Sequence, residues 1–332
     1  MITATWNEYR LSRLMLGTVQ FGMPYGVANR TGQPTYDEVL AIVAAAVEGG
    51  VNCFDTAAAY GTSEEVLGRA LHELGIADRV VVVSKVRPLT DAELADGVLA
   101  SRAIEQSVRD SRRRLQLDCL PVVLFHREAH VMYCDVLAGL RAKGSLRYAG
   151  VSCDNRPGPA STFVAAGNMS ALQLPANVLD RRHQRSGVFQ QAASRGVAVF
   201  IRSVYLQGLL LMPEDDIPPA LCGIIPVRRH LASIARAAGM HLAELAVRFM
   251  LAQPGVTCVL TGVETVAQVR ENLAIVARGP LPDDMLRAID LATPELSETL
   301  ITPSLWPNVP TQARHIPYAA ETSTTNNTNQ HE

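Results

Sequence analysis

The stretch Val-Asn-Cys-Phe-Asp-Thr-Ala-Ala-Ala-Tyr-Gly, residues 51–61, decides how the rest of the chain is laid out. Its first four residues are apolar or small and follow two glycines, as expected of a buried strand in a parallel sheet. Asp55 falls where that strand should end, and Tyr60 follows on a loop of small residues. An acid at a strand end and a phenol on the adjoining loop can converge on one spot. The alternative is an ordinary loop with a capping acid and a packed tyrosine.

Strand-like and helix-like segments alternate outward from this stretch. The expected strands are 11–17, 51–54, 80–83, 119–125, 146–151, 171–174, 197–201 and 257–260. The expected helices are 35–48, 64–74, 97–115, 131–143, 161–166, 188–195, 227–238, 242–252, 266–277 and 282–291. Thr35, with Glu38 three residues on, predicts a capping box at the first of these helices.

This rhythm of strands and helices over about 260 residues is typical of a (β/α)8 TIM barrel with its active site at the C-terminal ends of the strands. A doubly wound sheet is disfavoured because no G-x-G-x-x-G follows the first strand. We expect one barrel with a C-terminal loop over residues 1–310. The polar tail, 311–332, is expected to be disordered, since its last ten residues include none that forms a core.

Composition excludes several classes of partner. With 30 basic and 32 acidic residues, the net charge of -2 gives no reason to expect nucleic acid or an anionic membrane. The six cysteines have neither a C-x-x-C motif nor metal-ligand spacing, and they indicate a reducing compartment. No signal-peptide core and no membrane-length apolar run is present, so we expect a cytoplasmic protein. The oligomeric state is left open.

Polar residues stand at three consecutive strand ends: Asp55 and Tyr60 after the second strand, Lys85 after the third and His126 after the fourth. Singly, such a lysine is typical of the surface and such a histidine of a structural hydrogen bond. Together they suit the reduction of a carbonyl by hydride. The lysine ammonium would lower the pKa of the tyrosine, the aspartate would hold the lysine, and the histidine would polarise the carbonyl oxygen, with no metal required.

The order of these four residues, with Asp-Thr-Ala-x-x-Tyr-Gly around the first pair, resembles the catalytic tetrad of the aldo-keto reductases, whose fold is a (β/α)8 barrel. The resemblance covers residues 14–273. It implies that Tyr60 is the general acid/base, that Asp55 and Lys85 tune it, and that His126 orients a small-molecule carbonyl substrate.

The resemblance also implies a nicotinamide cofactor. Gly17 and Thr18 match residues near the nicotinamide and its phosphates, where Asp55 is also assigned. Ser152 and Gln173 match the pair that binds the carboxamide. Cys153 stands where the family usually has an Asn, and it is therefore left out of the expected site.

The loop after the seventh strand matches the segment that covers the pyrophosphate, through Ser203, Leu206, Gln207 and Gly208. Many members stack a Tyr or Trp on the nicotinamide just before that serine. Here the position is Arg202, whose guanidinium plane can also stack on a ring.

The adenosine end of the cofactor corresponds to Gly262, Gln268, Glu271 and Asn272, at a helix N-terminus suited to phosphate. The Lys and Arg that hold the 2′-phosphate in some branches are Gly262 and Gln268 here. NADP(H) is expected by family precedent, with NAD(H) possible.

The substrate expected from the resemblance is a sugar-type carbonyl, because the sequence of residues 16–22 and 202–212 is similar to that of a bacterial branch associated with sugar metabolism. Tyr25 and Arg127 are further candidates for substrate contact, and Trp306 could cover the site. Two alternatives stay open. One is a cofactor-binding regulatory barrel with little turnover, and the other is a lyase or aldolase that uses Lys85 as a Schiff-base nucleophile.

Overall fold

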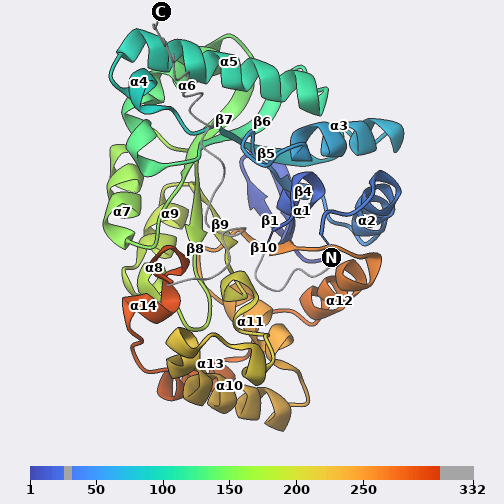
Figure 1. Ribbon diagram of the computed structural model, residues 1–332, viewed down its shortest axis with the longest axis vertical. Helices are drawn as coiled ribbons and strands as arrows, with labels where there is room; N and C mark the ends of the chain where they lie inside the picture. The colour runs from blue at the N-terminus through green and yellow to red at the C-terminus, as the bar shows by residue number, and fades with distance from the viewer. Residues whose placement is uncertain (26–31, 307–332) are drawn as a thin grey trace, which may run out of the picture.

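A closed barrel of parallel strands forms the centre of the computed structural model, which describes residues 1–25 and 32–306, with helices around it (Figure 1). Each strand pairs with the next along the chain, and the last pairs with the first through Gly262 and Gly17. The (β/α)8 barrel is thus confirmed. The strands of the barrel are β3 (Leu14–Gly17), β4 (Cys53–Asp55), β5 (Val81–Val86), β6 (Leu120–Phe125), β7 (Leu146–Ser152), β8 (Ala171–Pro175), β9 (Ala198–Arg202) and β10 (Cys258–Gly262).

The helices between the strands form the outer layer, and the predicted capping box of Thr35 and Glu38 is present at α2. The α-helices are α1 (Val19–Gly22), α2 (Tyr36–Glu48), α3 (Ser63–Glu73), α4 (Asp91–Leu94), α5 (Gly97–Leu115), α6 (Cys134–Ala142), α7 (Pro157–Ala166), α8 (Arg182–Arg185), α9 (Val188–Ser194), α10 (Ile225–Ala237), α11 (Leu242–Leu251), α12 (Val266–Ala277), α13 (Asp283–Ala292) and α14 (Glu298–Ile301). Short 3-10 helices cover Glu128–Tyr133, Leu206–Gly208, Glu214–Asp216, Pro219–Ile224 and Pro303–Leu305.

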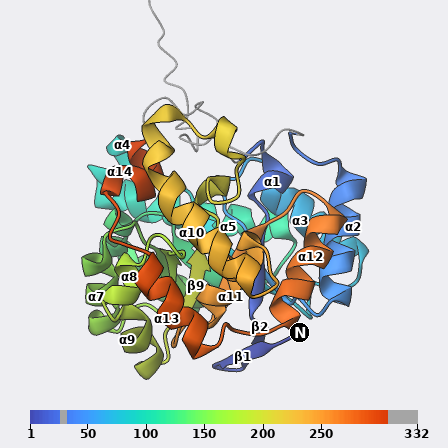
Figure 2. The same cartoon turned by 90° about the horizontal axis from the view of Figure 1, so that it is seen from below.

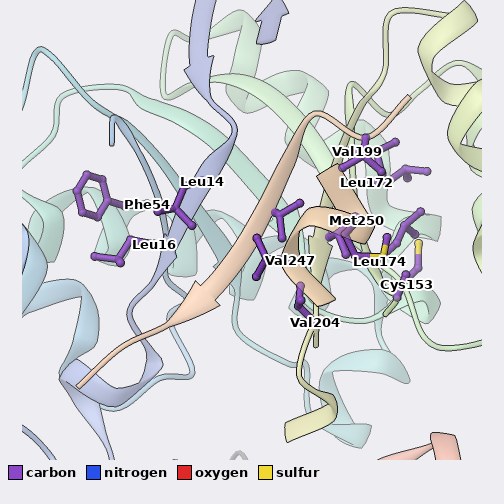
Figure 3. Packing of buried hydrophobic residues seen from close by; sticks show 14 of the residues in the cluster. Leu14, Leu16, Phe54, Cys153, Leu172, Leu174, Val199, Val204, Val247 and Met250 are labelled. Atoms are coloured by element: carbon purple, nitrogen blue, oxygen red, sulfur yellow. The ribbon is translucent and has the colours of Figure 1, made fainter. Parts of the chain in front are cut away.

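Alternation along the strands divides the core into two layers. Leu14, Leu16 and Phe54 point outward and pack with the helices, as Figure 3 shows. Met15 and Cys53 point inward and fill the barrel. Side chains two residues apart along a strand share a face. The inward-facing positions near the C-terminal end of each strand therefore lie at one end of the barrel, here called its mouth. Polar residues placed there lie next to one another in space.

An antiparallel hairpin of β1 (Thr3–Trp6) and β2 (Tyr9–Ser12) precedes the barrel, which corrects the expectation of one strand over 11–17. In Figure 2 the hairpin lies at the end of the molecule opposite to the yellow segment that follows β9. The Trp6 ring centroid lies 4.7 Å from that of Tyr148, and its Nε1 donates to the carbonyl of Gly196 at 3.0 Å. The hairpin therefore closes the lower end of the barrel.

Smaller departures concern element ends. The helix expected over 131–143 begins as a 3-10 helix at Glu128, and α1, α4, α8 and α14 were not expected. Lys85 and Asp55 lie within their strands, not after them. In the part of the chain that the structure describes, no helix is long and apolar enough to span a membrane. The tail at 311–332, predicted to be disordered, lies outside the described residues.

Candidate active site

Asp55 and Lys85 form a buried ion pair at the mouth of the barrel. Lys85 Nζ lies 2.7 Å from Oδ1 and 2.8 Å from Oδ2 of Asp55, and it donates a third hydrogen bond to the Thr56 carbonyl at 2.9 Å. Asp55 follows inward-facing Cys53, and Lys85 follows inward-facing Val83. Their exposed fractions are 4% and 1%, so the pair is shielded from water. The three hydrogen bonds account for the three protons of an ammonium group.

Tyr60 and His126 lie beside this ion pair. The ring centroid of Tyr60 is 4.8 Å from Lys85 Nζ and 5.7 Å from the centroid of His126, which it meets edge to face at 85°. Both side chains are half-buried. The structure therefore brings together all four residues that the sequence placed at three strand ends.

The pKa values of these groups follow from burial. Burial, and then the charge of Asp55, raise the pKa of Tyr60 above its ordinary value, and the charge of Arg202 opposes the rise. The sequence had led us to expect a lowered tyrosine pKa. The Asp55 carboxylate neutralises the charge of Lys85 through its bidentate contact. This explains why the pKa of Tyr60 is raised and not lowered. Burial lowers the pKa of His126 well below its ordinary value, as do the charges of Lys85 and Arg202, so the imidazole is neutral at pH 7.

Ser152 and Gln173 lie side by side on β7 and β8 and are both buried. Gln173 Nε2 donates to Asp55 Oδ1 at 2.7 Å, which links this pair to the ion pair. The Ser152 hydroxyl donates to Gln173 Oε1 across 3.4 Å, a long hydrogen bond. A carboxamide could replace that bond with shorter ones.

Arg202 extends from the end of β9 toward the same residues. Its Nη2 donates to the Cys153 carbonyl at 2.9 Å and its Nη1 to Ser203 Oγ at 3.3 Å. Its charge shifts the pKa values of Tyr60, Lys85 and His126.

Cys153, in the position where an Asn was expected by resemblance, points away from the mouth. Its side chain packs in the outer core near Leu174 (Figure 3) and is fully buried. Burial raises the pKa of its thiol well above the ordinary value, and a hydrogen bond with the Glu128 carboxylate adds to the rise. Glu128 is not among the site residues expected from the sequence.

The loop after β9 has an unusual backbone. Ser203, Leu206, Gln207 and Gly208 have φ values of +64°, +49°, +55° and +94°. Within the loop, the N–H groups of Leu206 and Gly208 donate to the carbonyls of Ser203 and Tyr205, both at 2.9 Å. This loop is the segment that the resemblance assigned to a pyrophosphate.

At the end of β3, Thr18 has a hydrogen-bonding role and Gly17 has a packing role. The Thr18 hydroxyl is fully buried and lies 2.9 Å from the Asp55 carbonyl and 2.8 Å from Ser63 Oγ. It therefore joins β3 to β4 and α3. A Cβ atom at Gly17 would come within 2.9 Å of Leu260, so the glycine allows close strand packing.

At the expected adenosine end, two side chains already have partners within the protein. Gln268 Oε1 accepts from the backbone of Glu264 at 2.6 Å and of Thr265 at 3.2 Å, completing a capping box at the start of α12. Asn272 is buried and bonds Thr261 at 3.2 Å.

Gly262 and Glu271, by contrast, are exposed at this end of the barrel. Gly262 lies against the amide of Gln20, whose Oε1 is buried with no partner among the described residues. Gln20 had no signal in the sequence.

A basic cavity of about 520 Å³ lies between the loop after β9, α10 and the start of α11. Its lining includes Arg228, Arg229, Arg236 and His241, together with Glu214, which pairs with Arg229 at 2.6 Å. His241 Nε2 lies 3.6 Å from Glu271 Oε1, so the cavity adjoins α12. Arg228 Nη1 is buried with no partner among the described residues.

The three remaining candidates fall in different surroundings. Tyr25 is in hydrogen-bond contact with Gln207, and its pKa responds to Tyr60, which places it at the site. Arg127 is exposed. Trp306 is 2% exposed and donates to the Leu300 carbonyl at 3.1 Å, so its ring packs in the core.

The geometry agrees with comparisons to known proteins. The model of the Aldo/keto reductase family matches residues 13–293. The chain belongs to the aldo/keto reductase family. It is 28% identical over 277 residues to the aldo-keto reductase YhdN of Bacillus subtilis, covering 76% of this chain and 81% of that protein.

Among solved structures, it resembles the holo form of aldo-keto reductase AKR11C1 from Bacillus halodurans, with a TM-score of 0.73, 23% identity and coverage of 89% and 97%. An aldo/keto reductase from Klebsiella pneumoniae in complex with NADP and acetate gives a TM-score of 0.66 at 21% identity, with coverage of 89% and 97%. This chain is thus an oxidoreductase of the family, and these structures share its fold.

Proposed function

We propose that this protein reduces an aldehyde or ketone, of the sugar type, to the alcohol with NADP(H) as the hydride donor and Tyr60 as the general acid. The proposal rests on one observation: the side chains of Tyr60, His126 and the Asp55–Lys85 pair lie next to one another at the mouth of the barrel. Family membership supplies the reaction class.

Each residue of this group has a defined part in the proton chemistry. The raised pKa of Tyr60 keeps its hydroxyl protonated, so that it can donate to the oxygen of a carbonyl as that oxygen gains charge. The neutral imidazole of His126 retains one N–H, which can donate to the same oxygen. The ammonium of Lys85, fixed by Asp55, lies beside the Tyr60 ring, and the charge of Arg202 favours negative charge left on the phenol. A bound reduced nicotinamide supplies the hydride.

The polar groups around the tetrad fit such a cofactor. The long Ser152–Gln173 contact leaves hydrogen-bonding capacity for a carboxamide. The loop from Ser203 to Gly208, which has four residues of positive φ, is assigned to the phosphates, and α12 begins beside Gly262. Gln268 and Asn272 are assigned to shaping the adenosine end of the cofactor site, because their side chains bond within the protein. Glu271 is assigned to direct contact with the cofactor.

NADP(H) is proposed over NAD(H) on the basis of the basic cavity beside α12. Without the Lys and Arg that clamp the 2′-phosphate elsewhere in the family, positive charge must come from another element. Arg228, with a buried and unpartnered Nη1 at this cavity, provides it. The NADP complex of the Klebsiella relative supports the same choice.

A polyhydroxylated substrate is proposed because the side chains around Tyr60 end in hydrogen-bonding groups that can bind hydroxyls. They are the phenol of Tyr25, the imidazole of His126 and the guanidinium of Arg202. The Schiff-base alternative is not favoured. Lys85 is 1% exposed and donates three hydrogen bonds, whereas a nucleophilic lysine must be neutral and open to the substrate.

The test is to titrate wild type and Tyr60→Phe with NADPH and NADH, and then to measure turnover with 4-nitrobenzaldehyde and aldoses. We expect both proteins to bind NADPH and only wild type to turn over. If neither protein binds either nucleotide, both the cofactor assignment and the proposed reductase activity are wrong. Binding without turnover in wild type would favour the regulatory barrel.

A further inference from the structure

Arg202 places a positive charge at the tetrad without an ion-pair contact to a carboxylate of the described residues. Its guanidinium bonds to two neutral groups, the Cys153 carbonyl at 2.9 Å and Ser203 Oγ at 3.3 Å. Within residues 1–25 and 32–306, it makes no ion pair. The backbone and the serine thus fix the orientation of this guanidinium.

No residue of the tetrad compensates the charge of Arg202. Lys85 is paired with Asp55 at 2.7 Å, and Tyr60 and His126 are neutral at pH 7. Glu128 is the nearby acid, and the charge of Arg202 acts on it without an ion-pair contact; its oxygens accept hydrogen bonds from the Asp154 amide at 2.9 Å and from the Cys153 thiol. The tetrad and Arg202 together carry one positive charge in excess.

The reaction itself places a nicotinamide ring within reach of this charge. The carbonyl oxygen must lie in hydrogen-bond distance of the Tyr60 hydroxyl, and the hydride donor about 3–3.5 Å from the carbonyl carbon. The charge of Arg202 acts on Tyr60, His126 and Lys85 from its fixed position. It therefore also acts on a ring held among them.

We infer that Arg202 makes the site select the reduced, uncharged nicotinamide over the oxidised ring, which carries a positive charge. This inference rests on the proposed function. The phosphates of the two oxidation states are identical, so the difference in affinity reports the ring alone. Two positive charges several ångströms apart in a largely buried site repel each other strongly enough for about a tenfold difference in affinity. The oxidised cofactor is expelled after turnover, and the resting enzyme holds the reduced form.

Calorimetric titration of Arg202→Gln, Arg202→Met and Arg202→Lys with NADPH, NADP⁺, NADH and NAD⁺ tests this selection. The ratio of Kd for the oxidised to the reduced form should fall about tenfold in the Gln and Met variants and be retained in the Lys variant. Most of the change should be tighter binding of the oxidised form. Arg156→Gln, which removes an exposed charge from the loop after β7, should leave the ratio unchanged.

An unchanged ratio in the two neutral variants overturns the inference, as does an equal change for both oxidation states, since that result indicates only a packing role. The use of two neutral variants guards against one that fails to fold. If wild type binds none of the four nucleotides, the proposed function fails and this selection fails with it. If wild type binds but the ratio does not respond to Arg202, only the selection is lost.

Discussion

Lys85 and Asp55, from neighbouring strands, hold each other through both carboxylate oxygens at 2.7 and 2.8 Å in a space almost closed to water. Removing one partner leaves a buried charge alone. We expect Asp55→Asn to lower the free energy of unfolding by about 3–5 kcal/mol, because the ammonium of Lys85 stays buried without its counter-charge. Urea unfolding of this variant, of Lys85→Met and of the double variant measures the effect. The double variant should be the more stable of the two that lack Asp55, and an equal loss in both would contradict a buried charge as the cause.

The pH dependence of turnover should be flat over the neutral range. The pKa of Tyr60 is raised, so the acid form persists well above pH 9, and the pKa of His126 is lowered, so the neutral ring persists down to pH 6 and below. We expect kcat for carbonyl reduction to be constant from pH 6 to pH 9. It is to be measured with saturating cofactor and substrate at constant ionic strength. A midpoint near pH 6.5 or between pH 8 and 9 would show that one of the two pKa values is placed wrongly.

The hairpin below the barrel should act on stability and not on catalysis. Trp6 packs against Tyr148 and donates to Gly196 at the end opposite the tetrad. Trp6→Ala should cost about 3–5 kcal/mol of unfolding free energy, because a large buried ring leaves a cavity. The KM and kcat of the folded fraction should not change. Arg10→Ala on the same hairpin alters an exposed side chain and serves as the control. A loss of catalysis in folded Trp6→Ala would mean that the lower end communicates with the mouth.

Arg228 should distinguish the two cofactors. Its Nη1 is buried beside the cavity that adjoins α12. Arg228→Ala should raise the Kd for NADPH about tenfold and leave the Kd for NADH unchanged, since only the former carries the 2′-phosphate. Arg109→Ala is the matched control, because α5 lies on the opposite side of the barrel in Figure 1. If both Kd values respond equally, the cavity does not hold the phosphate.

The sequence predicts the barrel and the tetrad for one physical reason. Buried parallel strands are continuous apolar runs, and the polar residues that end them share the mouth. Alternation then brings Asp55 and Lys85 to one face. The hairpin was missed because residues 11–17 were interpreted as one strand, whereas a bend at Arg13 separates the end of β2 from β3.

The protonation of the site could not be predicted from residue spacing. Tyr60 has a raised pKa because burial outweighs charge, and burial is a property of the whole fold. Likewise, Gln268 and Thr18 match family positions in sequence, but their side chains bond within the protein. Their hydrogen-bond partners come from the packing of neighbouring elements, which a local motif does not encode.

Aldehydes are electrophiles that add to thiolates, and a protein that binds them is exposed to damage by its own substrate. Burial, and then the charge of Glu128, raise the pKa of the Cys153 thiol and keep it protonated, and Cys53 inside the barrel is equally buried with a raised pKa. Cys222, in contrast, is an exposed thiol. Covalent adducts and alkylating reagents should therefore reach Cys222 before the half-buried Cys119 and Cys134, while the buried Cys53, Cys153 and Cys258 stay unmodified.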